Sequence, residues 1–210
     1  MTYTFGIEIE TSGASISAIK SALEAAEIRG CDVKPDGTPG VDAEIVLPPL
    51  APCDFAWDYI NSICRVLDRV GADVNSKCGL HVHIGNAPLN DSTHAVRFCG
   101  DSIQARARTG RYITGAYAEP MDFVAVQDIM YRYTRQQSTI NTMFPRSRTD
   151  NRYCAPLSLA RIERATTIRD LTFGKFTSIN LETWGRGTIE FRQASGTIEA
   201  DKIINWVKFL

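Results

Sequence analysis

Three short segments of the sequence alternate apolar residues with residues that can bind metal ions or phosphate groups. They lie at 6–10, 80–84 and 189–192, and they carry Glu8 with Glu10, His81 with His83, and Glu190 with Arg192. Because successive side chains of a strand point to opposite faces of a sheet, each segment would present its polar groups on one face. If the three strands share one sheet, one face is a packed core and the other is a catalytic surface.

The acidic residues of these segments need a cation among them. Glu8 and Glu10 would lie roughly 7 Å apart on the same face, and Glu190 and Glu44 would add further negative charge, which raises carboxyl pKa values. A divalent metal ion removes that cost. Carboxylate oxygens combined with imidazole nitrogens are typical of Mg²⁺ or Mn²⁺ sites, and Mg²⁺ takes its remaining ligands from water and substrate phosphates.

Simpler interpretations of the same residues exist. A Glu-x-Glu pair on an edge strand can serve only as a charged, solubilising face. Cys78, His81 and His83 have the spacing of part of a zinc site, but no second Cys/His cluster completes it. Three segments of the same kind in one short chain favour the metal-binding surface over both.

Charge is distributed unevenly along the chain, although the net charge is only −1. Residues 1–96 carry 13 acidic and 6 basic residues, whereas 97–169 carry 12 arginines, no lysine and 6 acidic residues. The planar guanidinium fork suits phosphate oxygens, so this arrangement can bring metal ions and phosphates together. A solvated helical face is the alternative.

Two other functions are compatible with these residues. The chain can be a nucleic-acid-binding module that uses the arginine-rich segment 97–169, although a pI near 6.3 lacks the basic excess of such modules and makes nucleic acid an improbable partner. It can also be a metal-dependent hydrolase, in which the carboxylates and histidines activate water.

Length and composition predict a single globular domain over residues 1–210. The sequence is 44% hydrophobic and has no uncharged apolar run near the ~18 residues that a membrane-spanning helix needs. No export signal is apparent, and the six cysteines include no C-x-x-C pair. We therefore expect a cytoplasmic protein with reduced thiols and no membrane partner.

Periodicity and turn residues predict the elements that position these groups. Strands are expected at 3–11, 43–47, 72–75, 79–85, 175–183 and 188–193, and helices at 15–29, 91–108, 121–137, 158–171 and 199–210. Asp54 is expected to cap a further helix that ends at Gly71, and 145–156 to form a polar loop. Strands at both ends of the chain indicate an α+β domain with a mostly antiparallel sheet and helices on one face.

An ordered set of motifs resembles the predicted amidoligases, a family related to glutamate–cysteine ligases and glutamine synthetase. The motifs cover nearly the whole chain. They lie at 5–10, 36–38, 44–50, 78–84, 148–154, 178–181, 187–192, 196–197 and at Trp206. Two departures are Leu47, where the family commonly has serine, and Lys175 with Phe176, where it commonly has Arg-Tyr. These leave the choice of substrate open.

The resemblance implies a glutamine-synthetase-like fold in which a curved antiparallel sheet forms the floor of the active site. It also implies ATP-dependent condensation of a small-molecule or peptide carboxylate with an amine, through an acylphosphate, with ATP and Mg²⁺ or Mn²⁺. The implied metal ligands are Glu8, Glu10, Glu44, His81 and Glu190. The implied catalytic residues are Arg192, Arg148 and Lys175, and the implied nucleotide or substrate contacts are Arg148, Asn151, Arg152, Lys175 and His83.

The phosphates would be held without a glycine-rich cradle. The sequence contains neither Gly-x-x-x-x-Gly-Lys nor Gly-x-Gly-x-x-Gly. Metal ions and arginines would therefore neutralise the charge that develops during phosphoryl transfer.

Overall fold

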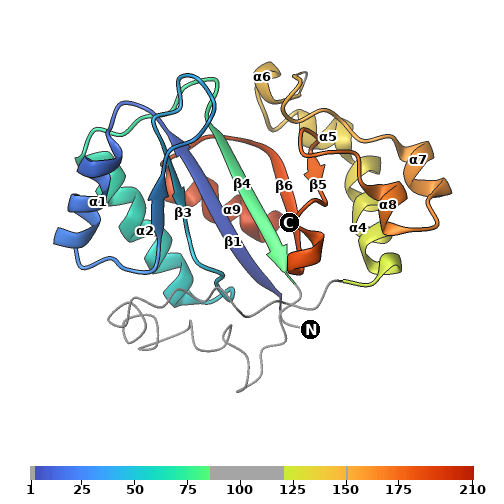
Figure 1. The fold of residues 1–210 in the computed structure, drawn as a ribbon, viewed down its shortest axis with the longest axis horizontal. Helices are drawn as coiled ribbons and strands as arrows, with labels where there is room; N and C mark the ends of the chain where they lie inside the picture. The colour runs from blue at the N-terminus through green and yellow to red at the C-terminus, as the bar shows by residue number, and fades with distance from the viewer. Residues whose placement is uncertain (1–2, 86–120, 150) are drawn as a thin grey trace.

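A six-stranded antiparallel sheet is the centre of the molecule, whose computed structural model describes residues 3–85, 121–149 and 151–210 (Figure 1). The strand order is β2-β3-β1-β4-β6-β5, and each of these neighbouring pairs is antiparallel. The strands are β1 (Thr4–Thr11), β2 (Asp32–Lys34), β3 (Ala43–Val46), β4 (Gly79–Gly85), β5 (Ile179–Asn180) and β6 (Thr188–Ser195). The α+β class is confirmed, whereas the glutamine-synthetase-like form and the single-domain boundaries stay predictions.

The two faces of the sheet differ in chemistry, as the alternation predicts. Ile7 and Ile9 of β1 are almost completely buried, as are Leu80 and Val82 of β4. Burying such side chains contributes roughly 1.5–3 kcal/mol each and fixes which face turns to the core. The intervening residues therefore share the opposite face, which we call the polar face; it carries Glu8, Glu10, Glu44, His81, His83, Glu190 and Arg192.

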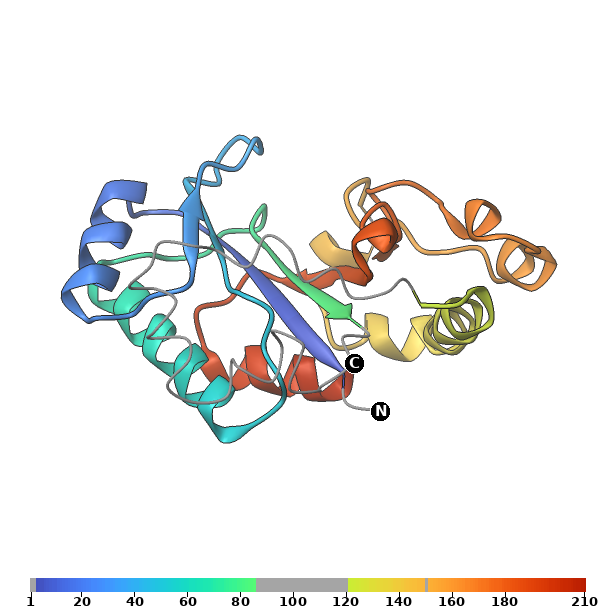
Figure 2. The same cartoon turned by 60° about the horizontal axis from the view of Figure 1, so that its bottom comes forward.

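Three helices cover the apolar face of the sheet (Figure 2). They are α1 (Ile16–Ala25), α2 (Asp54–Arg69) and α9 (Ala200–Phe209). The helix predicted to end at Gly71 is confirmed as α2, and its residues Ile60, Ile63 and Leu67 are fully buried. The predicted cap is wrong by one residue, because Cys53 is the N-cap and Asp54 lies in the first turn, where its charge still complements the helix dipole.

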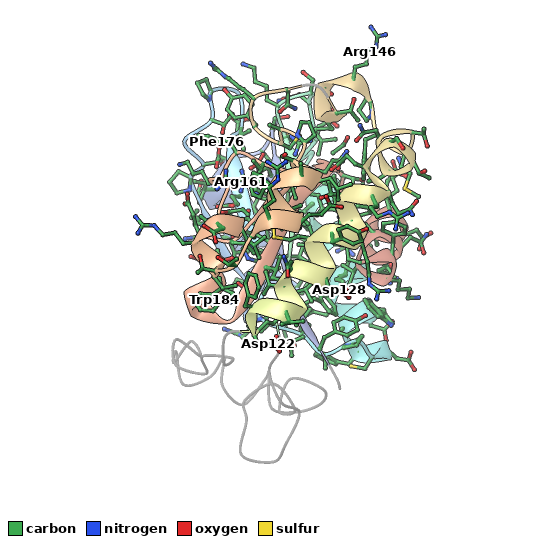
Figure 3. All side chains as sticks on the ribbon, turned by 90° about the vertical axis from the view of Figure 1, so that its right-hand side faces the viewer. Asp122, Asp128, Arg146, Arg161, Phe176 and Trp184 are labelled. Carbon is green, nitrogen blue, oxygen red and sulfur yellow. The ribbon has the colours of Figure 1, made fainter. Side chains whose placement is uncertain are left out.

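A second group of helices flanks β5 and β6 (Figure 3). It contains α4 (Phe123–Arg135), α5 (Gln137–Asn141), α6 (Arg146–Thr149), α7 (Leu159–Arg164) and α8 (Ile168–Leu171). The Tyr133 ring of α4 contacts the Phe191 ring of β6 with a centroid distance of 5.3 Å. The turn η2 (Trp184–Arg186) joins β5 to β6, and Trp184 Nε1 donates to the Met121 carbonyl at 2.9 Å.

Local side-chain hydrogen bonds shorten several predicted elements. The helix predicted at 158–171 is two helices, because Ala165 is extended and Thr167 begins α8 with a capping box that Asp170 completes. The strand predicted at 175–183 is reduced to β5. Thr177 Oγ1 bonds to the carbonyls of Gly174 and Ile179 there, which competes with regular pairing.

Two further predictions about elements are wrong, because 72–75 is not a strand and the loop predicted at 145–156 contains the helix α6. One prediction lies outside the described residues. The segment 72–75 is not a strand but a single bridge between Ser12 and Asp73, because the Asp73 and Asn75 side chains cap local turns. The structure adds β2, which is too short for its alternation to be visible in the sequence. The helix predicted at 91–108 falls outside the described residues. In the part of the chain that is described, no helix has the length and apolar character needed to cross a membrane.

Candidate metal centre and active site

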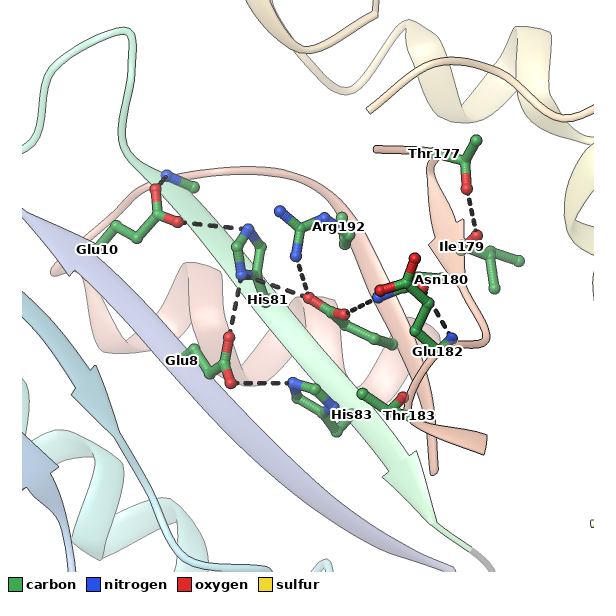
Figure 4. Close-up of polar contacts among 12 residues, drawn as sticks. Glu8, Glu10, His81, His83, Thr177, Ile179, Asn180, Glu182, Thr183 and Arg192 are labelled. Carbon is green, nitrogen blue, oxygen red and sulfur yellow. Dashed lines mark hydrogen bonds and ion pairs between the residues drawn. The ribbon is translucent and has the colours of Figure 1, made fainter. Parts of the chain in front are cut away.

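Glu8, His81 and Glu190 meet on the polar face of the sheet. Figure 4 shows the side chains of Glu8 and His81 pointing toward each other. One ligand atom of each of the three residues lies within 4.8 Å of the other two, and we call these residues the carboxylate–imidazole cluster. His81 Nδ1 lies 3.2 Å from Glu8 Oε2 and 3.5 Å from Glu190 Oε1. The register explains the meeting, because Glu8 of β1 stands directly opposite His81 of β4, and β6 pairs with the other edge of β4.

Glu10 borders the cluster and is partly committed to the backbone. Its Oε1 lies 3.6 Å from His81 Nε2, while its Oε2 accepts a hydrogen bond from the Gly79 amide at 2.6 Å. A Cβ atom on Gly79 would stand only 2.9 Å from His81 Nε2 and 3.1 Å from an Arg148 nitrogen. The absence of a side chain at Gly79 is therefore what lets these groups converge.

Two histidines contact the carboxylate of Glu8, one at each oxygen. His83 Nε2 lies 3.3 Å from Glu8 Oε1, on the side opposite the His81 contact. Burial alone would raise the pKa of Glu8, but its hydrogen bond to His81 and the attraction of His83 outweigh burial and lower the pKa well below its usual range. The pKa of His83 is raised, since the attraction of Glu8 outweighs the lowering by burial. Glu8 is thus held as an ionised carboxylate, the form that binds a metal ion.

Glu44 lies beside Lys34 and outside the cluster. Lys34 Nζ is 2.8 Å from Glu44 Oε2, and the Lys34 side chain is 46% exposed while that of Glu44 is 9% exposed. Burial and the nearby charge of Glu8 raise the pKa of Glu44 to about 7. Sequence reasoning missed Lys34, which shares the polar face because it stands opposite Glu44 in β3.

Glu44→Gln should change how the stability of the metal-free protein depends on pH. With its pKa raised from 4.5 to about 7, the folded protein holds the Glu44 proton more tightly than the unfolded chain does. The free energy of unfolding of the wild type therefore falls as pH rises through that window. In the variant, the free energy of unfolding should decrease less between pH 5 and pH 8, by an amount of the order of 2 kcal/mol. Urea unfolding in the presence of EDTA at these two pH values measures the difference. Identical pH dependence in wild type and variant would contradict the assignment.

Glu190 is anchored on both sides, and its neighbour Arg192 has an unused donor. Glu190 Oε1 forms an ion pair with Arg192 Nη1, and Oε2 accepts from Asn180 Nδ2 at 2.6 Å. Within the described part of the chain, the buried Arg192 Nε has no hydrogen-bond partner. A buried donor without a partner calls for an explanation, such as a bound water, an ion or a ligand group. Asn180 belongs to the motif at 178–181 in the sequence, but its contact with Glu190 depends on the pairing of β5 with β6.

The sequence matches a family model described as "putative amidoligase enzyme" over residues 24–210. The chain belongs to this amidoligase family. The matched segment contains His81, Glu190 and Arg192, whereas Glu8 precedes it and joins the site through the pairing of β1 with β4. No curated protein matched the sequence.

In this amidoligase, Arg148 is buried and bonds to the backbone. Its side chain belongs to α6, the residue is only 5% exposed, and burial lowers its pKa. Nη2 donates to the Arg192 carbonyl at 2.5 Å and Nε to the Gln193 carbonyl at 3.3 Å. The guanidinium expected to contact phosphate is thus already engaged by the strand that carries the site.

The remaining expected contacts lie in loops of the amidoligase beside β5. Asn151 Oδ1 accepts from the amides of Tyr153 and Cys154 at 2.6 and 2.9 Å, which stabilises a turn. Arg152 and Lys175 are exposed and lie over the rings of Tyr153 and Phe176, which contact each other edge to face. These two cations are available to an anionic ligand, but they do not contact the cluster.

The donor set of the amidoligase suits a hard divalent cation. Two carboxylates and one imidazole converge, and among the described residues they are the one group of His, Cys, Asp and Glu side chains that could hold a metal ion. Cys78 lies outside that group, and burial raises the pKa of its thiol. The alternative of a zinc site formed by Cys78, His81 and His83 is therefore not assembled. Two carboxylates and an imidazole are ligands that suit Mg²⁺ or Mn²⁺.

Proposed function

We propose that this amidoligase is an ATP-dependent ligase that joins a carboxylate to an amine through an acylphosphate. The observation that carries the proposal is the convergence of Glu8, His81 and Glu190 beside Arg192, whose Nε has no hydrogen-bond partner among the described residues. Family membership supports the ligase class. The substrates are a small-molecule or peptide carboxylate and an amine.

The reaction divides one difficult substitution into two easier steps. A carboxylate oxygen attacks the γ-phosphorus of ATP, which releases ADP and forms the acylphosphate; the amine then attacks the acyl carbon and expels phosphate. A Mg²⁺ or Mn²⁺ ion held by Glu8, His81 and Glu190 would neutralise charge on the transferring phosphate. The guanidinium of Arg192 would bind the phosphoryl oxygens through the donor that is free of Glu190. His83 contacts the other oxygen of Glu8 and would help to keep that carboxylate ionised.

Two arginines of the segment 97–169 bond to the protein itself, which weakens the nucleic-acid-binding alternative at these positions. Both donate to backbone carbonyls, Arg148 to those of Arg192 and Gln193, and Arg161 to those of Asp170 and Thr172. Their guanidinium groups are engaged within the protein, which reduces the surface that would face a phosphate backbone.

Mn²⁺ or Mg²⁺ should raise the melting temperature of the wild-type protein. Binding to the folded state alone stabilises it by mass action, by about 3–6 °C when free metal exceeds its dissociation constant about tenfold. Thermal melts with and without millimolar metal and ATP measure the shift, and Glu8→Gln should abolish most of it. An unchanged melting temperature for folded wild-type protein would count against a metal centre.

Trapping with hydroxylamine tests the proposed reaction class. The protein is incubated with Mg²⁺, ATP and a pool of amino acids, polyamines and cell-wall peptides, and mass spectrometry detects condensation products alongside released phosphate. Adding hydroxylamine should divert the acylphosphate to a hydroxamate of one carboxylate in the pool. Hydrolysis of a compound in the pool without any need for ATP would instead support a metal-dependent hydrolase and overturn the proposal.

A further inference from the structure

β6 contains a bulge directly opposite His81. Leu80 pairs with Ala194 and Val82 pairs with Phe191, so the single residue His81 of β4 faces two residues of β6, Arg192 and Gln193. An extra residue interrupts the ladder of hydrogen bonds and re-aims the side chains around it. The bulge therefore controls how Arg192 and the preceding Glu190 are presented to His81.

The guanidinium of Arg148 bonds to the carbonyls of both bulge residues. Nη2 donates to the Arg192 carbonyl at 2.5 Å and Nε to the Gln193 carbonyl at 3.3 Å. Because the residue is 5% exposed, these donors satisfy carbonyl groups that water reaches poorly. Arg148 lies in α6, so a residue outside the sheet stabilises the bulge of β6.

The same guanidinium also reaches the first residue of β4. Arg148 Nη2 lies 3.1 Å from the position that a Cβ of Gly79 would occupy, and the Gly79 amide holds Glu10. One side chain thus contacts both the strand of His81 and the strand of Glu190 and Arg192. A planar fork can span two carbonyls in this way, whereas a lysine ammonium concentrates its donors at one point.

We propose that Arg148 is a positioning residue that fixes the β6 bulge so that Glu190 and Arg192 face His81, rather than a group that contacts substrate. Only the predicted change in kcat depends on the proposed function, whereas the predicted change in Mn²⁺ affinity does not. Without the fork, the bulge carbonyls lose their partners, and a shift of one residue in pairing would replace Arg192 by Gln193 on the polar face. The cluster would then be disordered even before nucleotide binds.

Arg148→Lys tests the proposal against a matched control. Arg161→Lys is the control, because Arg161 also spans two carbonyls, with Nε to Asp170 and Nη2 to Thr172 at 2.9 Å each, but in the α7–α8 region. Four quantities are measured for both: Mn²⁺ affinity without nucleotide, kcat, KM for ATP, and melting temperature. Arg148→Lys should lower Mn²⁺ affinity about 10- to 100-fold and lower kcat, with KM for ATP within a few-fold of wild type. Arg161→Lys should leave metal affinity and kinetics unchanged.

Two results would overturn the proposal. A large increase in KM for ATP with unchanged Mn²⁺ affinity would show that Arg148 contacts the nucleotide, and a lower melting temperature with unchanged affinity and kcat would show a purely structural role. If Arg148→Lys gives no cooperative melt, Arg148→Gln is measured in its place. Wild-type protein that binds Mn²⁺ but does not turn over ATP would overturn the proposed function, while the Mn²⁺ comparison would still decide the role of Arg148.

Discussion

Glu190→Gln should reduce ATP-dependent turnover by about 100-fold or more while the protein stays folded. The amide keeps the shape of the side chain and its contact with Asn180. It loses the negative charge that would attract a cation to the cluster with Glu8 and His81. It also leaves Arg192 without its anionic partner, so that the guanidinium is no longer held toward the cluster. Turnover, circular dichroism and the Mn²⁺-induced melting shift are measured on the same preparation.

Glu182→Gln is the matched control for this substitution. Glu182 is an exposed carboxylate close to the same strands, drawn in Figure 4, and it lies outside the carboxylate–imidazole cluster. The control should retain wild-type turnover and the full melting shift. Near wild-type turnover in Glu190→Gln would remove Glu190 from the metal centre.

Arg192→Lys should lower turnover by about 10- to 1000-fold. Arg192 forms an ion pair with Glu190 through Nη1 and keeps a buried Nε donor without a partner in the described part of the chain. A lysine can satisfy Glu190, but it cannot at the same time offer a second, fixed donor to a phosphoryl oxygen. The loss should therefore appear in kcat, with only a modest change in melting temperature.

The ion pair itself supplies the competing explanation for Arg192. If the guanidinium only stabilises Glu190, Arg192→Lys would lower the melting temperature somewhat and leave the ATP-dependent rate within a few-fold of wild type. Arg169→Lys, on the exposed side of α8, provides the baseline for an arginine outside the site. Comparing kcat and melting temperature in both variants separates a substrate contact from a structural ion pair.

The polar face was predictable because a strand has a period of two. Ile7 and Ile9 must be buried, so Glu8 and Glu10 must point the other way, and the same argument places His81 and Glu190. The alternation fixes the face within each strand. It does not state which strands are neighbours, and the meeting of Glu8 with His81 and Glu190 depends on the order β1-β4-β6.

The parts of the site that sequence reasoning missed depend on irregular or long-range structure. Lys34 lies in a three-residue strand, which is too short to show a periodic pattern, yet it forms an ion pair with Glu44. The burial of Arg148 follows from the packing of α6 against a bulge in β6, and no local pattern marks a bulge. The break between α7 and α8 did have a signal, since Thr167 and Asp170 have the spacing of a capping box.

Transfer of oxygen from substrate to phosphate tests the central claim most directly. The protein is incubated with Mg²⁺, ATP, polyamines and a pool of amino acids and cell-wall peptides whose carboxylates all carry ¹⁸O, and the released phosphate is examined by mass spectrometry. If the carboxylate attacks the γ-phosphorus, one ¹⁸O atom appears in each phosphate that accompanies a condensation product, and Glu190→Gln abolishes both. A second incubation uses unlabelled substrates in ¹⁸O-labelled water. Phosphate that carries no oxygen from the substrate in the first incubation, but carries oxygen from water in the second, would contradict the acylphosphate route and indicate that the site activates water.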